Sequence, residues 1–179
     1  MTIARPIPSP ASFVHACLLA ASFCLSSPVW GNDISVSEPN TALAKLQSFK
    51  DRASELAMRA MGMIGIHYKY GGNSPEHGLD CSGLVRYVFK EAWGTNLPRT
   101  SEEISRVGLH IETQDLQPGD LVFYNTLKHA FSHVGIYLGD NKFIHSPAPG
   151  GAVRIESMDL SYWKKRFNGA RRINDPDQR

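Results

Sequence analysis

Residues 80–93 read DCSGLVRYVFKEAW. The apolar residues of this stretch recur at three- and four-residue spacing, which predicts a helix with one buried face: Leu84, Val85, Val88, Phe89 and Ala92. Asp80 directly precedes this helix, and aspartate is a preferred N-cap residue, so Cys81 is predicted to lie in the first turn. The positive end of a helix favours a negative charge, and we therefore expect the pKa of the Cys81 thiol to be lowered.

The segments on either side predict a mixed fold. Apolar residues between Thr41 and about Met63 recur at helical spacing, in one helix or two, and residues 100–103 (TSEE) have the form of a capping box. Further along, alternating or continuous apolar runs predict strands at 121–124, 133–138, 142–146 and 153–156. Helices followed by antiparallel strands are typical of the α+β class.

Two histidines fall in consecutive predicted strands, on either side of a turn at Gly139-Asp140-Asn141. A three-residue hairpin loop would place His133 and His145 on the same face of the sheet, in diagonal positions. A two-residue loop would place them on opposite faces. Because a shared site needs both side chains together, we expect the three-residue loop.

The N-terminal 31 residues differ from the rest of the chain. They contain one charged residue, Arg5, and an apolar run from Phe13 to Leu25. A membrane span needs roughly 20 residues, so this shorter run fits the core of a secretory signal, and we predict cleavage after Gly31. An unstructured or buried segment is the alternative. Residues 32–48 are then a linker and the start of the N-terminal helix, and residues 49–175 form the main domain.

Removal of the signal would leave Cys81 as the one cysteine of the mature chain, because Cys17 and Cys24 would leave with it. A lone thiol in an oxidising compartment is a candidate reactive group and cannot form an internal disulfide. Lipidation of Cys17 or Cys24 would anchor the chain to a membrane, although the residues before each fit such a site poorly. The net charge of +2 gives no basic excess for nucleic-acid binding.

Cys81, His133 and His145 together match the needs of nucleophilic catalysis. A histidine can take the thiol proton and return it to a leaving amine, and a second polar group can orient that histidine. Backbone N–H groups at the helix start can stabilise the oxyanion. One cysteine and two histidines could instead hold zinc, but the close ligand spacing typical of zinc sites is missing. We expect no cofactor.

Several motifs resemble the NlpC-type papain-like cell-wall peptidases: Asp80–Val85, Gly119–Phe123, His133–Gly139, Phe143–Ser146, Tyr68–Gly72 and Leu97–Arg99. The resemblance spans about residues 50–173. It implies a papain-like fold, with N-terminal helices packed on a C-terminal antiparallel sheet, and a cysteine peptidase domain at 49–175. It implies Cys81 as the nucleophile, His133 as the general base and His145 as the third polar residue. It also implies that Tyr68 and Ser82 contact the oxyanion or the substrate.

Residues 162–172 resemble a proteobacterial branch of murein endopeptidases, which cut between D-alanine and meso-diaminopimelate. Other branches cut between D-glutamate and diaminopimelate, and a non-catalytic wall-binding module is a further alternative. The resemblance implies a monomeric, exported, periplasmic enzyme whose partners are peptidoglycan stem peptides. Attachment to the outer membrane stays open. We expect Asp80 to act as a helix cap, whereas Arg99 fits a substrate contact and a structural ion pair equally well.

Overall fold

The computed structural model describes residues 40–127 and 129–174, and the predicted signal segment, its cleavage site, Cys17 and Cys24 lie outside them. The elements, in order, are α1 (Asn40–Met61), β1 (Asn73–Ser74), β2 (Gly78–Leu79), α2 (Cys81–Trp93), α3 (Ser101–Ile104), β3 (Leu109–Ile111), a 3₁₀ turn (Thr113–Asp115), β4 (Leu121–Tyr124), β5 (His133–Gly139), β6 (Lys142–His145), β7 (Arg154–Ser157), α4 (Ser161–Lys164) and β8 (Phe167–Arg172). None of the described helices is both long and apolar enough to span a membrane.

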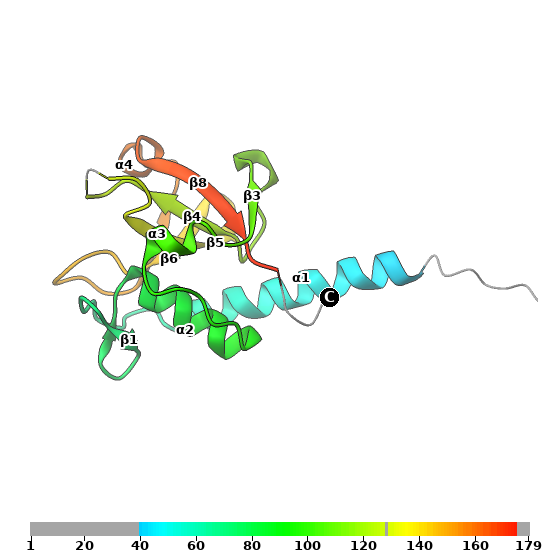
Figure 1. The fold of residues 1–179 in the computed structure, drawn as a ribbon, viewed down its shortest axis with the longest axis horizontal. Coiled ribbons are helices and arrows are strands. Elements are labelled where there is room, and N and C mark those ends of the chain that lie inside the picture. Colours follow the sequence, from blue (N-terminus) through cyan, green and yellow to red (C-terminus); the bar gives the residue numbers. More distant parts are fainter. Residues whose placement is uncertain (1–39, 128, 175–179) are drawn as a thin grey trace, which may run out of the picture. The chain divides into compact units, whose positions relative to one another are not determined.

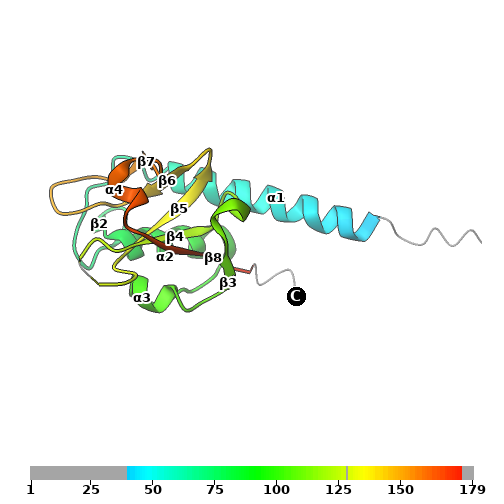
Figure 2. The same cartoon turned by 90° about the horizontal axis from the view of Figure 1, so that it is seen from above.

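The main sheet has six antiparallel strands in the order β3-β8-β4-β5-β6-β7 (Figure 1). Helices α1 and α2 pack on one side of it, as the view from above also shows (Figure 2). Burial of the apolar faces of both helices against the sheet forms the larger core, with Leu56, Leu84, Val85, Phe89, Phe123, Val134 and Ile136 among its members. The predicted α+β class is confirmed.

The other side of the sheet carries a smaller core. Successive side chains of a strand point to opposite faces of the sheet, and every second residue of the central strands therefore contributes to this core. Its members include Val122, Tyr124, Tyr137 and Phe143. Trp163 of α4 covers this face. His133 pairs with Tyr124 across the strands, and its ring stacks on Trp163 with 5.6 Å between ring centroids. The smaller core is therefore also the packing that surrounds the histidines.

Helix α2 begins and ends as its sequence predicts. Asp80 adopts extended backbone and its Oδ1 accepts the Gly83 N–H at 2.7 Å, which is the N-cap interaction. Gly94 ends the helix in the left-handed conformation, with φ of 64°. Helix α1 is one continuous helix, but its described side chains become buried only from Ala53 onward, and Leu43 is 64% exposed.

The β5–β6 hairpin differs from the expected loop. The turn proper has two residues, Asp140 and Asn141, both with positive φ, as in the tight turns that match strand twist. A bulge between Tyr137 and Gly139 adds the missing residue to β5. The pairing of Ile136 with Ile144 consequently puts His145 diagonal to His133 on one face. The three-residue loop was wrong, and the shared face was right.

Strand β8 was not predicted as a strand. It lies between β3 and β4, and residue pairs such as Leu121 with Arg171 join positions fifty residues apart. Arg172 makes two 2.7 Å hydrogen bonds to the buried carboxylate of Asp120, which holds β8 to the turn before β4.

Candidate active site

Cys81 lies at the N-terminus of α2, where the helix meets β5. The backbone N–H groups of Val134 and Ser82 lower the pKa of its thiol. Val134 directly follows His133, so the thiol lies near the start of the strand that carries this histidine. Gly83 allows the start of α2 to pack closely on the segment at Gly72, because a Cβ at Gly83 would lie 2.0 Å from the carbonyl oxygen of Gly72. The start of α2 is thus fixed by close packing of two main-chain segments.

A polar network fixes the residues on both sides of Cys81. Asp80 accepts the N–H groups of Gly71 and Gly83, at 2.9 and 2.7 Å, and pairs with Arg99 at 2.6 Å. The Ser82 hydroxyl donates to Asp80 and accepts from Arg99 at 2.7 Å. Asp80 is a cap, as expected, and Arg99 forms the structural ion pair. The Ser82 hydroxyl is already bonded within this network, and its backbone N–H is the group that faces the thiol.

His133 and His145 meet directly. The Nε2 atom of His133 lies 2.8 Å from Nδ1 of His145, and both side chains are buried. This hydrogen bond leaves Nδ1 as the one nitrogen of His133 that can serve another partner. Gly135 follows His133 by two residues along β5 and so lies on the same face, where a Cβ would approach Cβ of His145 in β6 to 3.3 Å.

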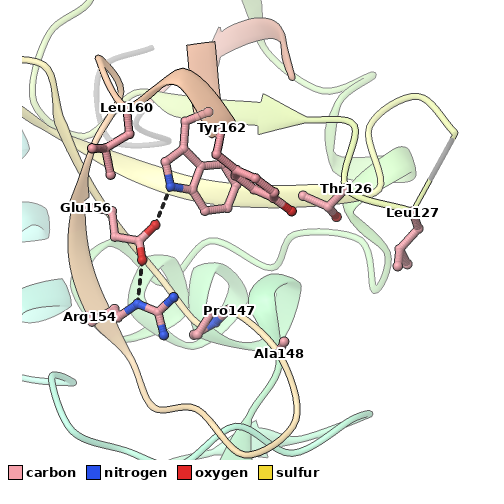
Figure 3. A pocket seen from close by; sticks show the side chains of 9 residues that line it. Thr126, Leu127, Pro147, Ala148, Arg154, Glu156, Leu160 and Tyr162 are labelled. Carbon is pink, nitrogen blue, oxygen red and sulfur yellow. Dashed lines mark hydrogen bonds and ion pairs between the residues drawn. The ribbon is translucent and has the colours of Figure 1, made fainter. Parts of the chain in front are cut away.

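Glu156 of β7 extends this pair, and the sequence interpretation missed it. Its Oε2 atom lies 3.5 Å from Nε2 of His145, and it also accepts the indole N–H of Trp163. Its Oε1 atom accepts Nε–H of Arg154 at 2.6 Å (Figure 3). The strand predicted at 153–156 includes Glu156. Which face of the sheet Glu156 lies on depends on how this strand pairs with β6, and the spacing of residues in the sequence does not predict that pairing.

A pocket of about 490 Å³ opens beside this carboxylate. Arg154 and Glu156 form one wall, and Pro147 and Ala148 lie below them (Figure 3). The remaining lining residues are Thr126, Leu127, Leu160, Tyr162 and Trp163. A mostly apolar pocket with one ion pair in its wall is typical of a site that binds part of a small molecule or peptide.

The expected lowering of the Cys81 pKa is wrong for this structure. Burial, and next the negative charge of Asp80, raise the pKa of the thiol to about 11. The hydrogen bonds from Val134 and Ser82 and the charge of Arg99 act in the opposite direction but are smaller. Removal of the sulfur from water thus outweighs the helix N-terminus.

Both imidazoles are neutral in the fold. Burial, together with the charge of His145, lowers the pKa of His133 to about 3, although Glu156 opposes this shift. Burial, followed by the charge of Arg154, lowers the pKa of His145 to about 3. A neutral imidazole can accept a thiol proton as a general base, which is the role predicted for His133 toward Cys81.

These neutral imidazoles make stability depend on pH. Between pH 6.5 and about 3 the unfolded chain binds protons at His133 and His145 that the folded chain does not bind. The free energy of unfolding should therefore fall as the pH drops through this window. We expect His145→Gln to make the fall shallower in urea titrations at pH 7, 5.5 and 4. His110→Gln, at an exposed site, should leave it unchanged, and equal slopes for all three proteins would contradict the assignment.

The remaining predicted site residue, Tyr68, is half-buried near the thiol. Burial, followed by the charges of Cys81 and Asp80, raises the pKa of its phenol. The four other described histidines are exposed: His67, His77, His110 and His129. Within residues 40–127 and 129–174, no group of three His, Cys, Asp or Glu side chains has an arrangement that could hold a metal ion.

Comparison with known proteins gives a consistent match. The model of the NlpC/P60 family matches residues 65–172. Murein DD-endopeptidase MepH of Escherichia coli K12 is 42% identical over 129 residues, which cover 70% of this chain and 48% of that protein. Murein DD-endopeptidase MepS/Murein LD-carboxypeptidase of the same strain is 42% identical, covering 61% and 56%. Gamma-DL-glutamyl hydrolase of Bacillus subtilis is also 42% identical, covering 63% and 27%. The chain thus spans about half or less of the length of these relatives.

Solved structures agree with this match. An NlpC/P60 family protein from Bacillus cereus has a TM-score of 0.63 and 34% identity, covering 67% of this chain and 39% of that one. The NlpC/p60 domain of the peptidoglycan hydrolase SagA has a TM-score of 0.60 and 29% identity, covering 68% and 98%. The fold is therefore the papain-like arrangement of that family.

Proposed function

The chain belongs to the NlpC/P60 family of cysteine peptidases, and on this premise we propose that it hydrolyses peptide bonds of peptidoglycan with Cys81 as nucleophile. The observation that carries the proposal is the 2.8 Å hydrogen bond between His133 and His145, on the strand whose Val134 backbone N–H lowers the pKa of the Cys81 thiol. A nucleophile, a base and an orienting group in this order are what acyl transfer needs.

In the proposed reaction, Nδ1 of His133 takes the thiol proton as the sulfur attacks the scissile carbonyl carbon. The tetrahedral intermediate carries its negative charge on the former carbonyl oxygen, and we propose that the backbone N–H of Ser82 and the phenol of Tyr68 stabilise it. The imidazolium of His133 then protonates the leaving amine, and a thioester remains on Cys81. Water, deprotonated by the same histidine, releases the acid and restores the thiol.

We propose the bond between D-alanine and meso-diaminopimelate as the preferred target. Two of the relatives are named as murein DD-endopeptidases, which supports this choice. The pocket adds a chemical reason, because in this cross-link the amine that leaves stands next to a free carboxylate. Arg154 keeps 49% of its side chain exposed in the pocket, where its guanidinium could bind that group.

The likeness to Gamma-DL-glutamyl hydrolase supports the alternative cut, after D-glutamate. Digestion of purified muropeptides separates the two. We expect cross-linked dimers to become monomers with intact stems, and uncross-linked tetrapeptide monomers to stay uncut, as seen by chromatography with mass analysis. Release of a shortened stem ending in D-glutamate would support the alternative cut. No cleavage of any muropeptide would reject the proposed substrate.

We further propose an exported, monomeric enzyme of the periplasm. Its support is the apolar run at residues 13–25, followed by small residues at 29 and 31, together with relatives named for acting on murein. Attachment to the outer membrane would require a lipid on Cys17 or Cys24. Fractionation of cells that make the full chain, with and without a Cys24→Ser or Cys17→Ser change, tests both statements.

A further inference from the structure

Glu156 is not required by the proposed reaction, yet it is tied into the site by four groups. It contacts Nε2 of His145 at 3.5 Å, the indole N–H of Trp163 and Nε–H of Arg154. Its charge also reaches His133, whose pKa it raises. Its side chain is 19% exposed, at the wall of the pocket, so the carboxylate is shielded without being fully enclosed (Figure 3).

The hydrogen bond between the two histidines can form in two ways. In the first, His133 carries its proton on Nε2 and donates it to Nδ1 of His145, whose own proton is then on Nε2. In the second, Nδ1 of His145 donates to Nε2 of His133, whose proton is then on Nδ1. Only the first pattern leaves Nδ1 of His133 free to accept the thiol proton.

The surroundings of His145 distinguish these patterns. Its Nε2 atom is buried and makes no hydrogen bond within the described part of the chain, and the nearest acidic oxygen is Oε2 of Glu156. In the first pattern a polarised N–H points at a carboxylate, which is attractive. In the second pattern a nitrogen lone pair faces the carboxylate, which is repulsive, and a buried site makes this difference larger.

We propose that Glu156 is a positioning residue that fixes the proton on Nε2 of His145 and thereby leaves Nδ1 of His133 unprotonated toward Cys81. The inference rests on the proposed roles of Cys81 and His133. After the thiol proton has moved, His133 is an imidazolium that donates through Nε2 to neutral His145, and the Glu156 carboxylate stabilises that positive charge. No proton has to pass to Glu156 at any step.

The experiment uses full-length protein with nitrogen-15 in its histidines, because two-bond proton–nitrogen spectra identify which ring nitrogen is protonated. We expect wild-type His145 to carry its proton on Nε2. Glu156→Leu should move it to Nδ1, lower kcat by about tenfold, and slow alkylation of Cys81 by iodoacetamide to the same extent. Glu156→Gln should keep most of the activity, because its carbonyl oxygen can accept the same N–H.

Glu112 offers a matched control, since its carboxylate also lies 3.5 Å from a histidine, His110, but at an exposed position. Glu112→Gln should change neither the spectrum nor the rates. If Glu156→Leu does not fold, the wild-type spectrum still decides, because a proton on Nδ1 of His145 would overturn the inference. A folded Glu156→Leu protein with the wild-type proton pattern and kcat would do the same.

Alkylation and spectra need no peptidoglycan, which separates this inference from the proposed substrate. A wild-type protein whose alkylation rate depends on His133 but which cuts no muropeptide would reject the substrate only. In that case the role of Glu156 is still tested by comparing Glu156→Leu with wild type in two measurements: the alkylation rate of Cys81 and the proton positions on the histidine rings.

Discussion

Replacement of Cys81 by alanine should reduce hydrolysis of cross-linked muropeptides by about 10,000-fold or more, because the proposed acyl intermediate forms on its sulfur. Binding of the muropeptide should persist, since the substrate contacts proposed for Arg154 and Tyr68 remain. The side chain is small and lies at the start of a capped helix, so the thermal unfolding temperature should change little. Product chromatography and calorimetric binding measure the two effects separately.

Cys81→Ser is the matched control for this prediction. It keeps the shape and a weaker nucleophile, so it should fold and bind as wild type and cut far more slowly. Cleavage by Cys81→Ala at a rate near wild type would exclude the thiol mechanism. If a chelator then removed that activity, the metal-dependent alternative would be supported. Binding without cleavage by the wild-type protein would support a wall-binding module.

Gly135→Ala is expected to disable the site without touching a catalytic group. A Cβ at this position would lie 2.7 Å from Cδ2 of Phe143, 2.8 Å from the carbonyl oxygen of Ile144 and 3.3 Å from Cβ of His145. Since a carbonyl in a paired strand cannot swing away, β6 must shift, and His145 moves with it. A displacement of this kind should lower kcat by about 100-fold. Overpacking should also cost about 1–3 kcal/mol of stability.

Gly62→Ala provides the comparison, because Gly62 is exposed just after α1 and the closest contact of a Cβ there would be 3.3 Å, to the carbonyl oxygen of Arg59. It should keep both activity and stability. Activity of Gly135→Ala is to be measured well below its own unfolding temperature, so that loss of folded protein does not contribute. A folded Gly135→Ala protein with wild-type kcat would show that the spacing of the two histidines tolerates a side chain between them.

Local signals predicted the part of the site that depends on neighbours in sequence. The helix at 81–93, its Asp80 cap and the strands that carry His133 and His145 follow from periodicity and capping, which act over a few residues. The motif order in residues 80–146 then predicted the family, which the family model and the relatives confirm. The roles of the individual residues stay predictions.

The parts that sequence reasoning missed all depend on pairing between distant segments. Glu156 reaches His145 only because β7 pairs with β6 in one register, and Trp163 reaches it from α4. A two-residue turn alone would place the two histidines on opposite faces of the sheet, but the bulge at Leu138 shifts the register and places them on the same face. The pKa of Cys81 depends on how completely the sheet and α2 enclose the sulfur, which no local pattern reports.

The position of β8 affects when the chain can fold during its synthesis. Every proposed catalytic residue lies before residue 146, yet β4, the neighbour of the His133 strand, takes its second partner from residues 167–172. A nascent chain that ends at His145 would hold the whole catalytic set with half of β4 unpaired. Pairings of this sequence separation form slowly, because a long loop must close first. We therefore expect such a chain to be unfolded and inactive until its synthesis has passed Arg172.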